Sequence, residues 1–171
     1  MQRDRTTTYK VVFYLLFVLI VYLLETATGL GSLNLFGARF DLLFSVPAAV
    51  ALMENLAIGA AAGLFTGILY DLSGTGVEGI LPLYFMLFAT FAGAISGRYL
   101  RRIWPSHLLL TAGGMLLLRG LQFVFAALAG RTYPMIPFLQ SMYGEILAAV
   151  VLSQFIYLPT LLLARRFDRM K

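Results

Sequence analysis

Two aspartates, Asp41 and Asp71, each stand beside an apolar run, and a pair of carboxyls is the catalytic group of an aspartyl membrane peptidase. That chemistry needs the two carboxyls close together, because the repulsion between like charges then keeps one of them protonated. Both residues are expected at the outer face of a membrane, so the pairing is one of three functional hypotheses. Two acidic residues often share a membrane face without any catalytic role, and this hypothesis ranks last.

Other catalytic groups are scarce. The chain has no cysteine, which excludes thiolate metal sites, cysteine nucleophiles and disulfides. Its single histidine, His107, cannot form a histidine-cluster metal site. A serine protease needs a serine and a histidine at one depth, and His107 is expected at the inner end of its helix, out of reach of Ser45 and Ser153. We therefore predict no enzymatic activity, no metal and no cofactor.

Charged groups also occur inside the apolar runs of the second half of the chain. Arg119 and Glu145 are expected at depths that differ by only about 3 Å. An unpaired charge in the centre of a bilayer costs at least about 2.5–3.5 kcal/mol, so the sequence predicts an Arg119–Glu145 ion pair. Gln122 or Glu25 would be further partners. The pair is interpreted as a clasp between two helices, and a substrate or proton site is the alternative.

Three glycines spaced by four residues, Gly59, Gly63 and Gly67, precede Asp71 at the same spacing. This spacing places them on one face of a helix, where a second backbone can approach closely. Packing within the chain is one interpretation of this face. The other is a groove for a partner's helix, with Asp71, Arg39 and Asp41 as polar contacts at its outer rim.

The elements that carry these residues are apolar helices. Apolar residues make up 60% of the 171 residues and charged residues only 12%, whereas soluble proteins contain about 45–50% and about 25%. Together with a mean hydropathy of +0.86, this predicts an all-α, polytopic integral membrane protein with about six transmembrane helices. We expect a single membrane domain, 1–171, with helices at about 9–29, 39–54, 56–73, 79–99, 107–129 and 138–164. The first is expected to be a spanning helix rather than a cleaved signal peptide.

The second and third segments are short for a full crossing. At 1.5 Å per residue they would measure about 24 and about 27 Å, slightly less than the hydrocarbon thickness. They are expected either to thin the bilayer locally or to form a re-entrant hairpin that neighbouring helices bury.

Orientation follows from the basic residues. Most of the 13 lysines and arginines fall on one side of a six-helix arrangement: Arg3, Arg5, Lys10, Arg98, Arg101, Arg102, Arg165, Arg166, Arg169 and Lys171. Arg39 and Arg131 fall on the other. The positive-inside rule therefore places both termini in the cytoplasm. The net charge of +5 is attributed to contact with anionic lipid rather than with nucleic acid, because no basic face or aromatic platform accompanies it.

Residues 38–81 carry a recognisable pattern. Ala38-Arg39-Phe40-Asp41-Leu42-Leu43, then Glu54-Asn55, then Gly63-Leu64-Phe65-x-Gly67-x-x-Tyr70-Asp71-Leu72 and Gly79 together resemble the rod shape-determining protein MreD family. The length, the six-helix plan, the basic ends and Glu25 late in the first helix are also similar to that family. Members often carry proline where this chain has Ala38.

The resemblance implies a non-catalytic scaffold in the bacterial cytoplasmic (inner) membrane that belongs to the cell-elongation machinery. Such proteins work with MreC and, indirectly, with MreB, a SEDS glycosyltransferase and a class B penicillin-binding protein. Whether the chain forms a homodimer stays open. The family's fold is similar to that of the substrate-binding subunits of energy-coupling-factor transporters, so a small-molecule transporter subunit is the rival function.

Overall fold

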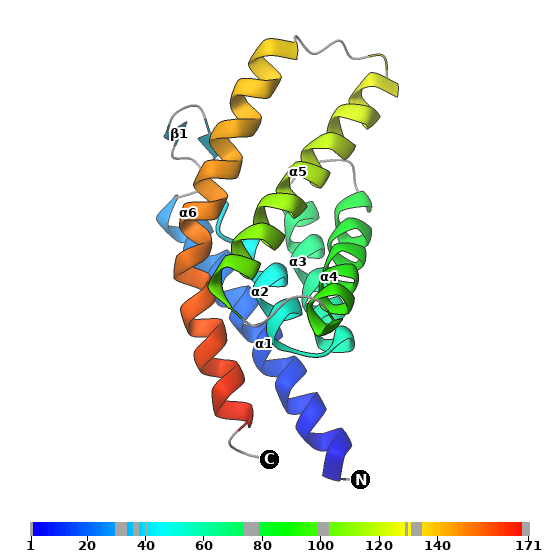
Figure 1. The fold of residues 1–171 in the computed structure, drawn as a ribbon, viewed down its shortest axis with the longest axis vertical. Helices are drawn as coiled ribbons and strands as arrows, with labels where there is room; N and C mark the ends of the chain where they lie inside the picture. The colour runs from blue at the N-terminus through cyan, green and yellow to red at the C-terminus, as the bar shows by residue number, and fades with distance from the viewer. Residues whose placement is uncertain are drawn as a thin grey trace.

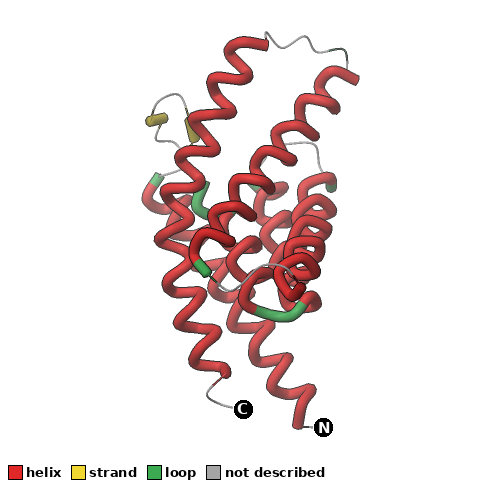
Figure 2. The backbone as a smooth tube through the Cα atoms, viewed as in Figure 1, coloured by secondary structure: helices red, strands yellow, loops and turns green. Residues whose placement is uncertain are grey.

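The fold of this chain is described by a computed structural model (Figure 1) that covers residues 2–29, 34–35, 38–39, 41–73, 79–98, 103–128, 130 and 135–168. These residues are helical apart from short connections and one pair of two-residue strands (Figure 2). The helices are α1 (Gln2–Thr28), α2 (Ser45–Met53), α3 (Leu56–Leu72), α4 (Ile80–Arg98), α5 (Trp104–Leu128) and α6 (Met135–Asp168). The predicted all-α fold class is confirmed.

Helix α2 begins six residues later than the helix predicted at 39–54. Residues 39 and 41–44, which were expected to be helical, instead lie in strand β2 and in a turn. Strand β1 (Asn34–Leu35) pairs antiparallel with β2 (Ala38–Arg39), and the helix begins only at Ser45. The apolar run conceals this start because it continues on both sides of it. The side chain of Asp41 accepts a hydrogen bond from the Phe44 amide at 3.1 Å, within the turn that precedes the helix.

Three helical segments are long and apolar enough to cross a membrane: Thr8–Thr28, Trp104–Phe125 and Ser141–Arg166. Helices α3 and α4 each offer a shorter apolar stretch of 17 residues or fewer, Leu56–Leu72 and Ile80–Ser96. Helix α2 has nine residues, all buried, and is about 14 Å long, so it cannot cross a bilayer by itself. These apolar helices indicate a membrane protein. In the described residues, helix length and composition identify three candidate membrane spans.

The buried helix α2 lies in the middle of the bundle, where it contacts α3, α4, α5 and α6. Helices α5 and α6 are antiparallel and in contact, and both extend beyond α3 and α4 at the top of the view in Figure 1. Helix α1 packs mainly on α3, through a core cluster that includes Tyr14, Val18, Ile58 and Ala62. Since every face of α2 is covered by protein, its polar backbone ends need partners inside the bundle.

The glycine face of α3 is filled by α4 of the same chain. A Cβ atom added at Gly63 would lie 2.3 Å from the Phe85 carbonyl oxygen, and one at Gly67 would lie 2.3 Å from the Pro82 Cα. At Gly59 it would lie 3.2 Å from the Ala51 Cα. The proposed groove for a partner's helix is therefore wrong for this face, because α2 and α4 already occupy it. The spacing correctly predicted close backbone packing, and only the structure shows that both backbones belong to one chain.

Candidate functional site

Helix α2 begins inside the bundle, and two carboxyls accept hydrogen bonds from the amides that immediately precede its start. Glu25 of α1 accepts a hydrogen bond from the Leu43 amide at 3.1 Å, and Asp41 accepts one from Phe44 at 3.1 Å. The amides of Ser45 and Val46 donate to the carbonyls of Leu42 and Leu43. Both carboxyls therefore lie at the positive end of the α2 dipole, which favours negative charge.

Tyr70 of α3 completes this arrangement. Its hydroxyl donates a hydrogen bond to Asp41 Oδ1, and its ring stacks on Phe85 with centroids 5.0 Å apart. Glu25 and Asp41 are near enough for their charges to repel each other. Three segments that are far apart in sequence thus meet at the start of α2.

The ion pair predicted from matching depths, Arg119–Glu145, is present between α5 and α6. Gln122 accepts a hydrogen bond from Arg119 Nη1 at 2.8 Å, as the sequence suggested. The charges of Arg119 and Glu145 also act electrostatically on the Asp41 carboxyl. We call Glu25, Asp41, Tyr70, Arg119, Gln122 and Glu145 the Asp41 cluster.

Of the two further partners considered for Arg119, Gln122 is the one that binds it. The Glu25 carboxylate instead accepts from the Leu43 amide, because the start of α2 lies beside it. Glu25 lies three residues before α1 ends at Thr28, so it lies near one end of the α1 span.

Two of the residues predicted to form a polar rim, Asp41 and Asp71, bind different groups. Asp41 is part of the Asp41 cluster, whereas Asp71 Oδ2 accepts a hydrogen bond from the Gly79 amide at 2.6 Å. Asp71 Oδ1 is buried and has no hydrogen-bond partner among the described residues. Arg39 is placed by its backbone in β2, and its side chain lies outside the described part of the structure. The geometry required for an aspartyl dyad of Asp41 and Asp71 is therefore not seen, because the two carboxyls bind different groups.

His107 lies nearer to Ser45 than the sequence suggested. The imidazole is fully buried, and its Nε2 lies 3.3 Å from the Ser45 carbonyl oxygen. Helix α2 starts deep in the bundle, which brings Ser45 down to the inner part of α5. The contact is with the main chain, while the Ser45 hydroxyl donates to the Leu42 carbonyl at 2.8 Å. These contacts therefore do not make Ser45 and His107 a nucleophile and its base.

A second set of polar contacts, between α1 and the turn before α3, was not predicted from the sequence. Lys10 Nζ lies 2.8 and 2.9 Å from the two carboxylate oxygens of Glu54, and the Tyr14 hydroxyl donates to the same carboxylate at 3.1 Å. We call these three residues the Lys10 clasp. Lys10 is only 5% exposed, although the sequence placed it in a basic tail. The available signal was Glu54, an acidic residue at a turn between two apolar helices that needed a cation.

In the part of the chain that the structure describes, no three histidine, aspartate or glutamate side chains are grouped so as to hold a metal ion. Comparison with protein-family models, with curated proteins and with solved structures finds no match for this chain.

Proposed function

We propose that this chain is a non-catalytic membrane scaffold of the MreD kind, which binds MreC and supports peptidoglycan synthesis along the lateral wall. The observation that carries the proposal is the convergence of the residues that resemble that family. Glu25, Asp41 and Tyr70 are separated by up to 45 positions, yet they bind one another or the same short turn.

The chemistry of these contacts suits a rigid scaffold. Each carboxylate of the Asp41 cluster accepts a hydrogen bond or forms an ion pair with a neighbour. These contacts hold the start of α2 in place and join α5 to α6. The turn residues Glu54 and Asn55 act likewise: Glu54 binds Lys10, and the Asn55 side chain caps α3 by accepting from the Ile58 amide at 3.0 Å. The resemblance adds the inner membrane as the location and the elongation machinery as the context.

The contact with MreC must lie elsewhere than on the glycine face, which α4 covers. Asp71 is the strongest remaining candidate, because its Oδ1 is an acceptor without a donor in the described residues. In this proposal a donor from MreC fills that position beside the end of α3, and Arg39 contributes from the strand pair.

The test is co-purification of tagged protein with MreC from the same genome. Asp71→Asn keeps the side-chain shape but removes the charge, and we expect it to reduce MreC recovery severalfold. Ser73→Ala is the matched control, since Ser73 is exposed and lies in the same turn. Full MreC recovery with Asp71→Asn combined with Arg39→Gln would refute these contacts. Coding regions for MreB and MreC beside this one would support the scaffold function independently.

A second candidate function, the substrate-binding subunit of a small-molecule transporter, is favoured by one observation. Arg119 Nε is buried and has no hydrogen-bond acceptor among the described residues. A ligand carboxylate could bind there beside Gln122. Melting of the purified protein with a panel of vitamins tests this function, because a bound ligand raises the melting temperature. A flat response across the panel counts against it.

A further inference from the structure

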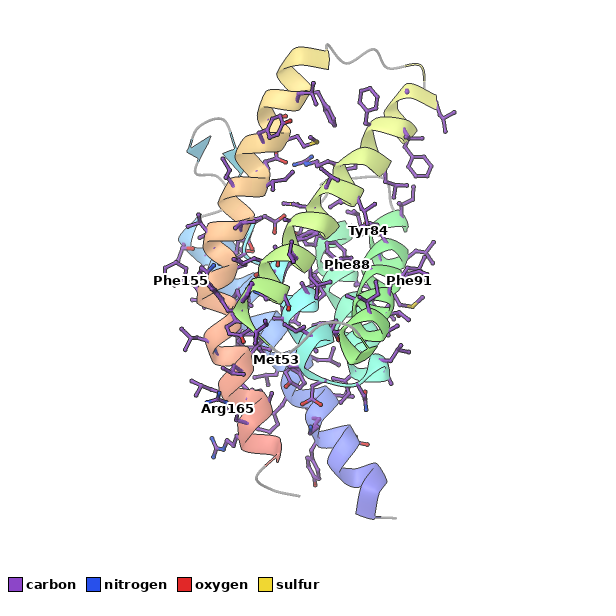
Figure 3. The ribbon with its side chains drawn as sticks, in the orientation of Figure 1. Met53, Tyr84, Phe88, Phe91, Phe155 and Arg165 are labelled. Atoms are coloured by element: carbon purple, nitrogen blue, oxygen red, sulfur yellow. The ribbon has the colours of Figure 1, made fainter. Side chains whose placement is uncertain are left out.

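The exposed apolar surface of this protein, measured along the helices, is shorter on one side of the bundle than on the other. Among the side chains of α4 that the structure describes, the exposed large apolar residues form a stripe at intervals of four: Leu83, Leu87, Phe91 and Ile95. These four described positions extend over about 18 Å along the helix. On α6 the corresponding stripe runs from Leu139 to Leu162 and measures about 35 Å. Phe91 and Phe155 mark the two sides in Figure 3.

Helix α3 shares the short side. Its exposed apolar residues run from Leu56 to Leu72, about 24 Å, and the whole helix has 17 residues. Hydrocarbon in a typical bilayer is about 30 Å thick. Tilting shortens the height that a helix covers, so tilt can accommodate the long α6 but cannot extend α3 or α4.

The short side is also fixed in length. Asn55 caps the start of α3, and the Asp71–Gly79 hydrogen bond joins the end of α3 to the start of α4. Between these ends, Gly63 and Gly67 bring the two backbones into direct contact, so neither helix can slide along the other without a clash. The lipid therefore has to adapt to this face.

We propose that the α3–α4 face lies against a locally thinned bilayer and selects phospholipids with short acyl chains, whereas the α6 face accepts chains of ordinary length. The proposal is independent of the scaffold function, because it depends only on the heights of two apolar faces. The partner is the bilayer itself, and the matching of hydrophobic lengths is the basis of recognition.

The chain has one tryptophan, Trp104, so a single fluorescent reporter can be moved between the two faces. In a Trp104→Phe background, Phe91→Trp reports on the short face and Phe155→Trp on the long face. Both phenylalanines are well exposed, at 65% and 71%, so the second variant is a matched control.

Each protein is reconstituted in vesicles that mix phosphatidylcholines with 14-carbon and 22-carbon monounsaturated chains, one of the two being brominated. We expect the 14-carbon lipid to quench the fluorescence of the Phe91→Trp variant in excess of its bulk fraction, by about twofold relative to the Phe155→Trp variant. Equal quenching ratios in the two variants, or enrichment of the 22-carbon lipid around the short-face reporter, would overturn the proposal.

A second measurement uses the unmodified chain and so avoids any effect of the substitutions on folding. Its melting temperature is recorded in vesicles of a single chain length, from 14 to 22 carbons. If the bilayer is thinned beside α3 and α4, we expect the highest melting temperature in the lipids with the shortest chains. A melting temperature that rises steadily toward 22 carbons would contradict it.

Discussion

At the scale of single residues, two ion pairs join charged groups that lie far apart in the sequence. Lys10 binds Glu54 over 44 positions, and Arg119 binds Glu145 over 26. Pairing is expected, because a buried charge without a partner is strongly unfavourable where water is excluded. The Lys10 clasp and the Asp41 cluster lie at opposite ends of α3: Glu54 precedes its first residue, and Tyr70 lies in its last turn.

The Lys10 clasp provides a prediction at this scale. Both side chains of the ion pair are less than a tenth exposed, so removing one partner leaves the other charge buried. Lys10→Met should lower the free energy of unfolding by about 3–5 kcal/mol. The double variant Lys10→Met with Glu54→Gln should recover most of that loss, because no uncompensated charge remains.

Denaturation in detergent micelles, with all three variants in a double-mutant cycle, measures this interaction. If the effects of Lys10→Met and Glu54→Gln simply add, the two residues do not interact in the folded protein.

At the scale of elements, the close contact between α3 and α4 depends on the absence of side chains. Gly63 faces the Phe85 carbonyl, a rigid backbone group that cannot move aside. Glycine costs a helix about 0.5–1 kcal/mol relative to alanine, so its presence here is explained by packing rather than by helix propensity.

This contact gives a prediction with an internal control. Gly63→Ala would place its methyl group 2.3 Å from the Phe85 carbonyl oxygen, and we expect it to destabilise the protein by at least about 1–3 kcal/mol. Gly113→Ala on α5 has nothing within 4 Å of the new methyl group and should be neutral or slightly stabilising.

Melting temperatures of the two purified variants distinguish the positions. Equal stability of Gly63→Ala and Gly113→Ala would mean that α3 and α4 do not approach each other as described.

At the scale of the whole molecule, α1 begins and α6 ends at the same end of the bundle (Figure 1). Arg165 and Arg166 lie in the last turn of the described α6, and Lys10 lies in the early part of α1. The positive-inside rule assigns this end to the cytoplasm. We therefore predict that both termini lie in the cytoplasm.

Fusions of a fluorescent protein that matures only in the cytoplasm, placed at Met1 and at Lys171, should both fluoresce. Alkaline phosphatase inserted between 131 and 134 should be active, since that connection is expected on the outer side. Fluorescence from only one terminus would require an odd number of crossings.

The sequence by itself determined the fold class, the approximate positions of five of the six helices, and the Arg119–Glu145 pair. These features follow from composition, from the length of apolar runs and from the depth of a charge, all of which are local properties. The start of α2 could not be read in this way, because the run from Leu42 to Met53 is almost entirely apolar on both sides of the true boundary.

Only the tertiary structure decided what the glycine face contacts and where the acidic residues point. Close packing against α4 and against a partner require the same spacing, so the sequence cannot distinguish them. Asp41 and Asp71 likewise look equivalent in sequence, but one lies beside the open amides of α2 and the other beside Gly79. Their partners come from other segments, and the folded arrangement of those segments determines the role of each carboxyl.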